Sequence, residues 1–393
     1  MLSWNNLVII CLVLSFSNLK GQEIKAREFV INIENMDNQN FSFLKKTVDE
    51  KKFVLIGEST HGVREFGEFK RKSVEFLIDS MGFSTILIES GFSDILKWTK
   101  KGEENYDSLV YSLFPIWHTN SYLKLFQFLK EKQIKVYGID PQNSSKYFRD
   151  FPYEQLMKID KNIANSFYEM DKEWSKAYSK PFSLWDSSFY ATKRKAIDTY
   201  DRILKKIYEG HTNKSSDYLF LERILENRLS MARNIKISAD MFHRDSIMKD
   251  NVDWLVRNIL EENEKVIILS HNAHVAKEKS FDIGYLGYLM SKEYDNNIFI
   301  IGQYFESGKF VNNKRELLTM PEPVKNSFES YLGQLKNEYH IFNLHSNTIP
   351  QKVFNKKINT YYMGGAMIQN FILSENYDMI FTVKHANPPI FID

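Results

Sequence analysis

Cysteine is almost absent from this chain of 393 residues, which contains a single one, Cys11. Cys11 lies inside the apolar run Leu7–Phe16, so a chain cleaved after this run would have no cysteine at all. A thiolate nucleophile, a disulfide framework and a cysteine-ligated metal site are then excluded.

An excess of charge of either sign is also missing. The 52 Lys and Arg residues are balanced by 50 Asp and Glu residues, which gives a formal net charge of +2. Because the basic residues are scattered among acidic ones, the composition gives no support for nucleic-acid binding. A hydrophobic content of 43% and a charged content of 26% are typical of a soluble globular protein with one large domain or two modest ones.

The apolar run Leu7–Phe16 is too short to cross a bilayer as a helix, and it is followed by the polar letters SNLKGQ. This pattern predicts a secretory signal peptide over residues 1–22, although no Lys or Arg precedes the run. Ile10 in front of Cys11 argues against a lipoprotein signal. We therefore expect a secreted or periplasmic protein without a stable membrane anchor after cleavage; the alternative is a buried strand or helix at the start of the domain.

Several short runs are apolar throughout, which is typical of strands buried on both faces of a parallel sheet. Amphipathic helical patterns lie between them, as in residues 67–82 and 121–132. This alternation predicts an α/β fold with a mostly parallel central sheet flanked by helices. The runs are Lys52–Gly57, Ser84–Glu89, Ile134–Asp140, Lys265–Ser270, Asn297–Phe305 and Met379–Val383.

The alternation stops in the middle of the chain, where strand signals give way to long, charged, periodic helical segments. We therefore expect a helical subdomain over residues 149–240, inserted between two parts of one α/β domain, 23–148 and 241–393. The predicted helices of the insert are 162–178, 192–210 and 217–235.

Charged and imidazole side chains gather where four predicted strands end. Ligands of parallel α/β sheets bind outside the carboxyl ends of the strands, so these side chains are expected to meet at one edge. Each alone has an ordinary structural explanation, such as a helix cap or a histidine buried in the core. Together they predict a site made of Glu58, His61, Glu89, Asp140, His271 and His274.

A nucleophilic serine has little support at this edge. The strand–turn–helix elbow of serine hydrolases reads G-x-S-x-G. Ser59 in GESTHG has the wrong glycine spacing, and GFSDI (Gly91–Ile95) lacks the second glycine. Water activated by a metal ion or by a general base is the remaining possibility for hydrolysis.

Two forms of water activation stay open on the residues alone. A single metal ion would use His and Glu ligands from the Glu58-x-x-His61 motif and the pair His271 and His274. Alternatively His61 acts as a metal-free general base oriented by Glu58 or Glu89. A cation and the second histidine pair would then stabilise an oxyanion, as in acyl transfer to water.

The residues around His61 resemble a known family. GESTHGVREF (residues 57–66) is similar to the G-E-x-x-H-G-x-x-E-F block of the erythromycin esterase family, and Lys70 and Glu89 have the spacing of that family's catalytic residues. Further blocks follow in the family's order, so the resemblance covers roughly Lys51–Val383. They are MGFSTILIESGFSD, KVYGIDPQ, RDSIMKDNVDWL, IILSHNAHV and GYLGYLM.

The resemblance implies a hydrolase that needs no metal or other cofactor and opens a macrolide lactone with water. His61 would be the general base, Glu58 and Glu89 would orient it, and His271 and His274 would line the opposite wall. Lys70 takes the position of an arginine in the macrolide esterases and keeps the charge without its two-pronged geometry.

The residues predicted to contact a small-molecule ester substrate are Arg64, Trp117, His118 and Asp140. Arg64 has the alternative of a salt bridge on its helix. The family is broad, so the substrate stays open between macrolides and other esters. A metal-dependent hydrolase and a non-catalytic binding protein on the same scaffold are the two alternatives.

Overall fold

The computed structural model describes residues 41–48, 50–99, 106–210, 215–235, 240–279, 283–346 and 349–392. The predicted signal peptide, residues 1–22, and Cys11 lie outside these ranges. Among the described helices, none combines the length and the apolar character that crossing a membrane requires. Secretion therefore stays a prediction from the sequence.

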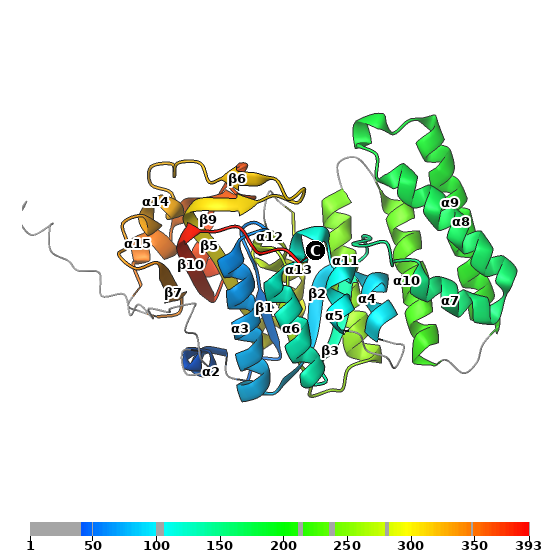
Figure 1. Cartoon of the computed structure of the whole chain (residues 1–393), viewed down its shortest axis with the longest axis horizontal. Helices are drawn as coiled ribbons and strands as arrows, with labels where there is room; N and C mark the ends of the chain where they lie inside the picture. The colour runs from blue at the N-terminus through cyan, green and yellow to red at the C-terminus, as the bar shows by residue number, and fades with distance from the viewer. Residues whose placement is uncertain are drawn as a thin grey trace, which may run out of the picture.

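A mixed, mostly parallel sheet forms the centre of the molecule, with strands in the order β3-β2-β4-β1-β5-β10-β7 (Figure 1). Only β7 runs antiparallel along this path, and β6 pairs antiparallel with the far end of β5. The six predicted strands are all present, which confirms the α/β class. The strands are β1 Phe53–Ile56, β2 Phe83–Gly91, β3 Lys135–Asp140, β4 Lys265–Leu269, β5 Ile298–Val311, β6 Leu317–Thr319, β7 Tyr339–Asn343 and β10 Met379–Ala386.

Both faces of the sheet are buried because helices cover each of them. Val54 and Ile56 of β1 pack into one core, together with side chains of α3 (Arg64–Met81) and α6 (Asn120–Glu131). Phe53 and Leu55 point to the other core, which α11 (Asp240–Asn258) and α13 (Leu286–Tyr294) complete. This is why the strand sequences are apolar without alternation.

Helix α3 illustrates how the sequence sets the borders of an element. Its amphipathic face buries Phe66, Phe69 and Leu77 against the sheet. The helix ends where Gly82 adopts a left-handed conformation with φ of 72° and donates its N–H to the carbonyl of Leu77. Glycine reaches this conformation without strain, so Gly82 stops the helix directly before β2.

Four helices after β3 pack around a core of their own, in the part of the chain where the helical insert was predicted (Figure 1). They are α7 Asp150–Ile159, α8 Lys161–Tyr178, α9 Ser187–Gly210 and α10 Ser216–Asn234. The side chain of Asp160 caps α8 by accepting the N–H groups of Asn162 and Ile163, as an N-cap aspartate is expected to do.

Shorter helices connect the remaining elements. Their bounds are α2 Ser42–Val48, α4 Phe92–Thr99, α5 Tyr106–Leu109, α12 Asn272–Val275, α14 Phe328–Leu332, α15 Gln351–Phe354 and α16 Leu373–Asn376, with 3-10 turns at Val110–Ser112, Pro115–Trp117, Phe182–Leu184 and Asp295–Asn297.

The sequence interpretation missed four strands: β6, β7 and the two strands of a separate hairpin, β8 and β9. Strands β8 (Lys357–Tyr362) and β9 (Met367–Ile372) form a separate two-stranded sheet and are joined by the turn that contains Gly364 and Gly365. Their mixed polar and apolar letters reflect partial exposure, so they lack the continuous apolar run that marks the central strands. The position of this hairpin matters because it brings Tyr362 and Met363 to the carboxyl edge of the sheet.

Candidate active site

Strands β2, β4 and β1 are neighbours in the sheet, so the segments that follow them meet at one edge. The segment after β1 carries Glu58 and His61, β2 carries Glu89 near its end, and β4 is followed by His271 and His274. The structure therefore brings together five of the predicted site residues, from parts of the chain more than 200 positions apart.

His61 is held by Glu58. Its Nδ1 lies 2.6 Å from Glu58 Oε1, and the indole N–H of Trp117 donates to the same oxygen over 3.1 Å. The rings of Trp117 and His61 lie nearly perpendicular to each other, with centroids 5.0 Å apart. His61 is thus fixed on one side by a carboxylate and on another by an aromatic ring, while its side chain stays 17% exposed.

Lys70 holds Glu58, the partner of His61, through a buried ion pair. Its ammonium group lies 2.8 Å from Glu58 Oε2 and donates to the carbonyl of Ser270 over 3.3 Å. The side chain is only 1% exposed, so it is part of the site's buried frame and does not line the opening. Burial disfavours the ionised form of Glu58, but the nearby Lys70 and the hydrogen bond with His61 outweigh it and lower the pKa of Glu58 to about 2.

Two glycines make the turn after β1 possible. A Cβ on Gly57 would lie 2.4 Å from the side-chain oxygen of Asn272 and 2.9 Å from its Cα, so no side chain fits there. Gly62 has φ of 73°, and a Cβ on it would meet the carbonyl oxygen of Val311 at 2.2 Å. The GESTHG motif therefore needs both glycines to set Glu58 and His61 against the sheet edge.

His271 faces His61 across the site, with ring centroids 5.2 Å apart. Its Nδ1 accepts the backbone N–H of Ala273 over 3.2 Å, so this nitrogen carries no proton. Burial, reinforced by the neighbouring His61, lowers the pKa of His271 to about 3. A neutral imidazole whose Nδ1 is an acceptor must carry its proton on Nε2, which makes His271 a hydrogen-bond donor near neutral pH.

Glu89 is an anchor for the segment after β4. Its Oε2 accepts the hydroxyl of Ser270 over 2.6 Å and the backbone N–H of His271 over 2.9 Å. Its Oε1 accepts a guanidinium N–H of Arg244 over 2.8 Å and lies 3.3 Å from Nε2 of His274. Burial raises the pKa of a carboxyl, yet His274 and Arg244 hold that of Glu89 well below its usual range.

His274 lies between two carboxylates. Its Nδ1 is 2.7 Å from Oδ1 of Asp245, which also accepts the backbone N–H of Leu286 over 2.9 Å. Burial disfavours the imidazolium, but Asp245 and Glu89 outweigh it and raise the pKa of His274 to about 10. The two histidines of the SHNAH segment therefore differ in charge: His271 is neutral and His274 is positive near neutral pH.

Arg244 is a central residue of this candidate site that the sequence interpretation missed. It comes from α11, and its guanidinium contacts Glu89, both carboxylate oxygens of Asp140 at 2.5 to 3.2 Å, and Nε2 of His274 at 3.3 Å. The RDSIMKDNVDWL block contained the signal, since its Arg-Asp pair is Arg244 and Asp245. In a charged helix an Arg-Asp pair is usually exposed to solvent. In this fold the pair points toward the sheet edge.

A cavity of about 450 Å³, which we call the strand-end cavity, opens over these groups. His61, Glu89, Trp117, His271, His274 and Arg244 line its polar side. Its apolar side comes from the Pro115–Trp117 turn, the β5–β6 hairpin and the β8–β9 hairpin, through Phe114, Ile116, Phe310, Leu318, Tyr362 and Met363. This size and mixed lining are typical of a small-molecule site.

The other predicted contact residues have distinct places. Asp140 is fully buried behind the strand-end cavity, where it pairs with Arg244. His118 is half-buried and its Nε2 lies 3.1 Å from the carbonyl of Leu113. Arg64 is 44% exposed and pairs with Glu65 at 3.2 Å, which matches the salt-bridge alternative. Of the four predicted contact residues, only Trp117 lines the strand-end cavity.

Within the described ranges, no group of three or more His, Cys, Asp and Glu side chains is arranged to hold a metal ion. Each carboxylate of the site is already engaged: Glu58 by Lys70, Glu89 by Arg244, and Asp245 by His274. Metal independence stays a prediction that requires a direct measurement.

The erythromycin esterase family model matches residues 78–386, well over half of the chain; His61 and Glu58 lie just ahead of the matched range. The hydrolase-like protein YbfO of Bacillus subtilis (strain 168) is 22% identical, with 98% of this chain and 97% of that protein covered. Erythromycin esterase type II of Escherichia coli is also 22% identical, over 66% of this chain and 69% of its own length.

Solved structures with low identity share the fold. A succinoglycan biosynthesis protein has a TM-score of 0.76 at 19% identity, with 94% of this chain and 97% of that chain covered. A mutant of erythromycin esterase EreC in its open conformation has a TM-score of 0.66 at 19% identity, with 92% of this chain and 97% of that chain covered. These structures share the arrangement of the sheet and the helices with this chain.

Proposed function

Because this chain belongs to the erythromycin esterase family, we propose that it hydrolyses ester or lactone bonds by using His61 as a general base toward water. The observation that carries the proposal is the short contact of 2.6 Å between His61 Nδ1 and an ionised Glu58. The proposal extends to an extracytoplasmic location, which is supported only by the signal-like N-terminus.

The contact with Glu58 sets the tautomer of His61. A carboxylate with a pKa of about 2 is ionised near neutral pH and accepts a hydrogen bond, so Nδ1 carries the proton. Nε2 is then the basic nitrogen, and Glu58 stabilises the imidazolium that forms when Nε2 takes a proton from water. Trp117 and Lys70 keep Glu58 in this orientation.

The opposite wall supplies groups that stabilise negative charge. The Nε2–H of neutral His271, positive His274 and the guanidinium of Arg244 line the strand-end cavity opposite His61. The water oxygen attacks the carbonyl carbon while its proton moves to His61, and the carbonyl oxygen becomes an oxyanion beside these donors. Collapse of the tetrahedral intermediate breaks the bond to the alcohol oxygen, which takes the proton back from His61.

A hydrolysis screen tests the proposal directly. We expect the protein without residues 1–22 to add one water to at least one member of a panel of macrolides, simple acyl esters and acylated glycans. Mass spectrometry detects this addition, and a mass gain of one water on an intact macrolide identifies lactone opening. Binding of a panel member without any turnover would contradict the proposal and support a non-catalytic binding protein.

Removal of divalent metal separates the proposal from a metallohydrolase. Since His61, Glu58 and the donors of the opposite wall are sufficient for water activation, we expect EDTA treatment followed by gel filtration to leave kcat unchanged. Elemental analysis of the same sample should show metal well below one equivalent. Loss of activity that zinc or manganese restores would assign the reaction to a bound metal.

A further inference from the structure

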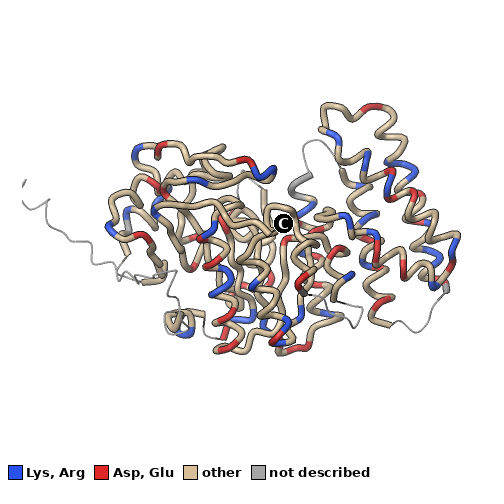
Figure 2. Tube along the Cα trace, in the orientation of Figure 1, with Lys and Arg blue, Asp and Glu red and all other residues tan. Residues whose placement is uncertain are grey.

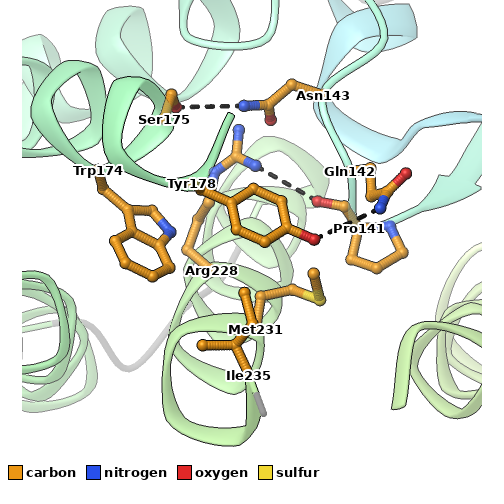
Figure 3. A pocket seen from close by; sticks show the side chains of 9 residues that line it. All are labelled: Pro141, Gln142, Asn143, Trp174, Ser175, Tyr178, Arg228, Met231 and Ile235. Atoms are coloured by element: carbon orange, nitrogen blue, oxygen red, sulfur yellow. Dashed lines mark hydrogen bonds between the residues drawn. The ribbon is translucent and has the colours of Figure 1, made fainter. Parts of the chain in front are cut away.

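A second pocket, which we call the side pocket, lies between the helical insert and the loop that follows β3 (Figure 3). It has a volume of about 30 Å³. Helices α8 and α10 form one part of its wall, and Pro141, Gln142 and Asn143 form the other. The insert therefore contributes side chains to a cavity next to the sheet edge.

Gln142 joins the two cavities, because it lines both the strand-end cavity and the side pocket. Its side-chain amide donates to the hydroxyl of Tyr178 over 3.5 Å, at the outer limit of a hydrogen bond. A side chain held this weakly can turn at little cost. A turn of Gln142 would connect the side pocket with the larger cavity in which His61 lies.

Arg228 supplies the charge of the side pocket and is itself 7% exposed. Its Nη1 donates to the carbonyl of Pro141 over 3.4 Å and its Nη2 to the hydroxyl of Ser93 over 3.5 Å, both long contacts to neutral oxygens. Its Nε pairs with Oδ1 of Asp171 at 3.1 Å. The two terminal nitrogens of this buried guanidinium therefore have only weak acceptors.

The surroundings of Arg228 favour an anion. Arg149 lies 3.9 Å from the other oxygen of Asp171, so two guanidinium groups share one carboxylate. Burial raises the pKa of the neighbouring Asp94 to about 7, which reduces the negative charge that this carboxyl contributes. Phe148 contacts both guanidinium groups through its ring, at 4.2 and 5.1 Å, and adds no charge.

The rest of the wall is apolar or aromatic. Trp174 and Tyr178 stack on each other with centroids 5.9 Å apart, and Met231 and Ile235 lie below Tyr178 in Figure 3. Asn143 contributes a buried amide oxygen that has no hydrogen-bond partner. A volume of about 30 Å³ holds only a small group such as a carboxylate at the guanidinium, so the hydrocarbon chain that carries this group would lie in the strand-end cavity and pass Gln142.

We propose that the side pocket is a substrate subsite that binds a carboxylate at the far end of an acyl chain, with Arg228 as its partner and Gln142 as the side chain that turns aside. This inference rests on the proposed function, because it assigns a substrate class to the same hydrolase: esters of dicarboxylic acids with one free carboxylate. Arginine suits this ligand because its fork of N–H donors matches the two oxygens of a carboxylate.

The test compares two pairs of chromogenic esters that differ only at the far end of the chain: 4-nitrophenyl monoesters of adipate and suberate against those of hexanoate and octanoate. The wild-type protein should have a kcat/KM about tenfold higher for at least one carboxylate-terminated ester than for its neutral counterpart. A preference for the neutral ester in both pairs would overturn the proposal.

Asn143→Asp is the matched variant, since it changes the amide into a carboxylate of the same shape. A like charge in the wall should lower kcat/KM for the carboxylate-terminated ester about tenfold more than that for the neutral ester. Equal losses for both esters would show a general disturbance and contradict the subsite. Should Asn143→Asp fail to fold, Ser175→Asp compared with Ser175→Asn makes the same comparison at the neighbouring position.

Failure of the subsite and failure of the proposed function are distinguishable by calorimetry with adipate itself. If none of the four esters is hydrolysed, the hydrolase assignment fails for this class, and the titration still decides the pocket. Adipate binding that Asn143→Asp weakens about tenfold supports the subsite. Absence of adipate binding to the wild type, or binding that Asn143→Asp leaves unchanged, overturns it.

Discussion

Replacing His61 with alanine is expected to lower kcat by about a thousandfold or more, because the group that takes the proton from water is lost. The fold should persist, since His61 is partly exposed and its removal leaves Glu58 paired with Lys70 and Trp117. Steady-state kinetics on the best substrate from the hydrolysis screen measures the loss, and circular dichroism monitors the fold.

His385→Ala is the matched control for this variant. His385 also pairs with a glutamate, Glu338 at 3.1 Å, but its side chain is 62% exposed and lies outside the strand-end cavity. We expect this variant to keep kcat within about twofold, because an exposed ion pair contributes little. If His61→Ala kept an activity close to that of the wild type, the general-base mechanism would be wrong.

Replacing Arg244 with methionine is expected to lower the free energy of unfolding by about 3–5 kcal/mol, the usual effect of removing one partner from a buried ion pair. Glu89 and Asp140 are both buried and would lose their shared cation. Hydrolysis should also fall at least about a hundredfold, because one donor of the oxyanion wall disappears and Glu89 loses a fixed partner.

Denaturant unfolding followed by circular dichroism measures the stability change, with Arg233→Met as the control. Arg233 pairs with Asp201 at 2.9 Å, but its side chain is 51% exposed, so its loss should cost less than about 1 kcal/mol. Arg244→Lys should recover part of the stability and little of the activity, because one ammonium cannot reproduce the forked contacts with both Glu89 and Asp140. If Arg244→Met and Arg233→Met were equally stable, the claim that Arg244 stabilises the buried carboxylates would be wrong.

Six strands of the central sheet and the strand-end residues were predictable from the sequence, because strands that are buried on both faces have continuous apolar sequences. An apolar run that ends in a charged side chain indicates a strand and the edge at which a ligand can bind, and Glu58, Glu89 and His271 all follow this pattern. The parallel arrangement then places these ends together. The charged residues that orient the strand-end residues have no such sequence pattern, because they resemble ordinary surface residues.

Lys70 and Arg244 differ in how far their burial can be predicted from the sequence. Lys70 lies on the stripe of α3 that faces the sheet, next to Phe69 and near Phe66 and Ser73, so helical periodicity alone indicates burial. Helical periodicity gives no such indication for Arg244, and only its place in the family-like block RDSIMKDNVDWL pointed to it. Tyr362 and Met363 are equally hard to predict as site residues, since the partly exposed strands of their hairpin have sequences that resemble loops.

The position of β1 has a consequence for how the chain folds. Phe53 of β1 pairs with Val266 of one neighbouring strand and with Ile298 of the other, so both partners of β1 are synthesised more than 200 residues after it. Contacts of such high contact order form slowly, and the chain cannot complete its core until most of it has been synthesised. A late-closing sheet of this kind suits the proposed export, in which the polypeptide must stay unfolded until it has left the cytoplasm.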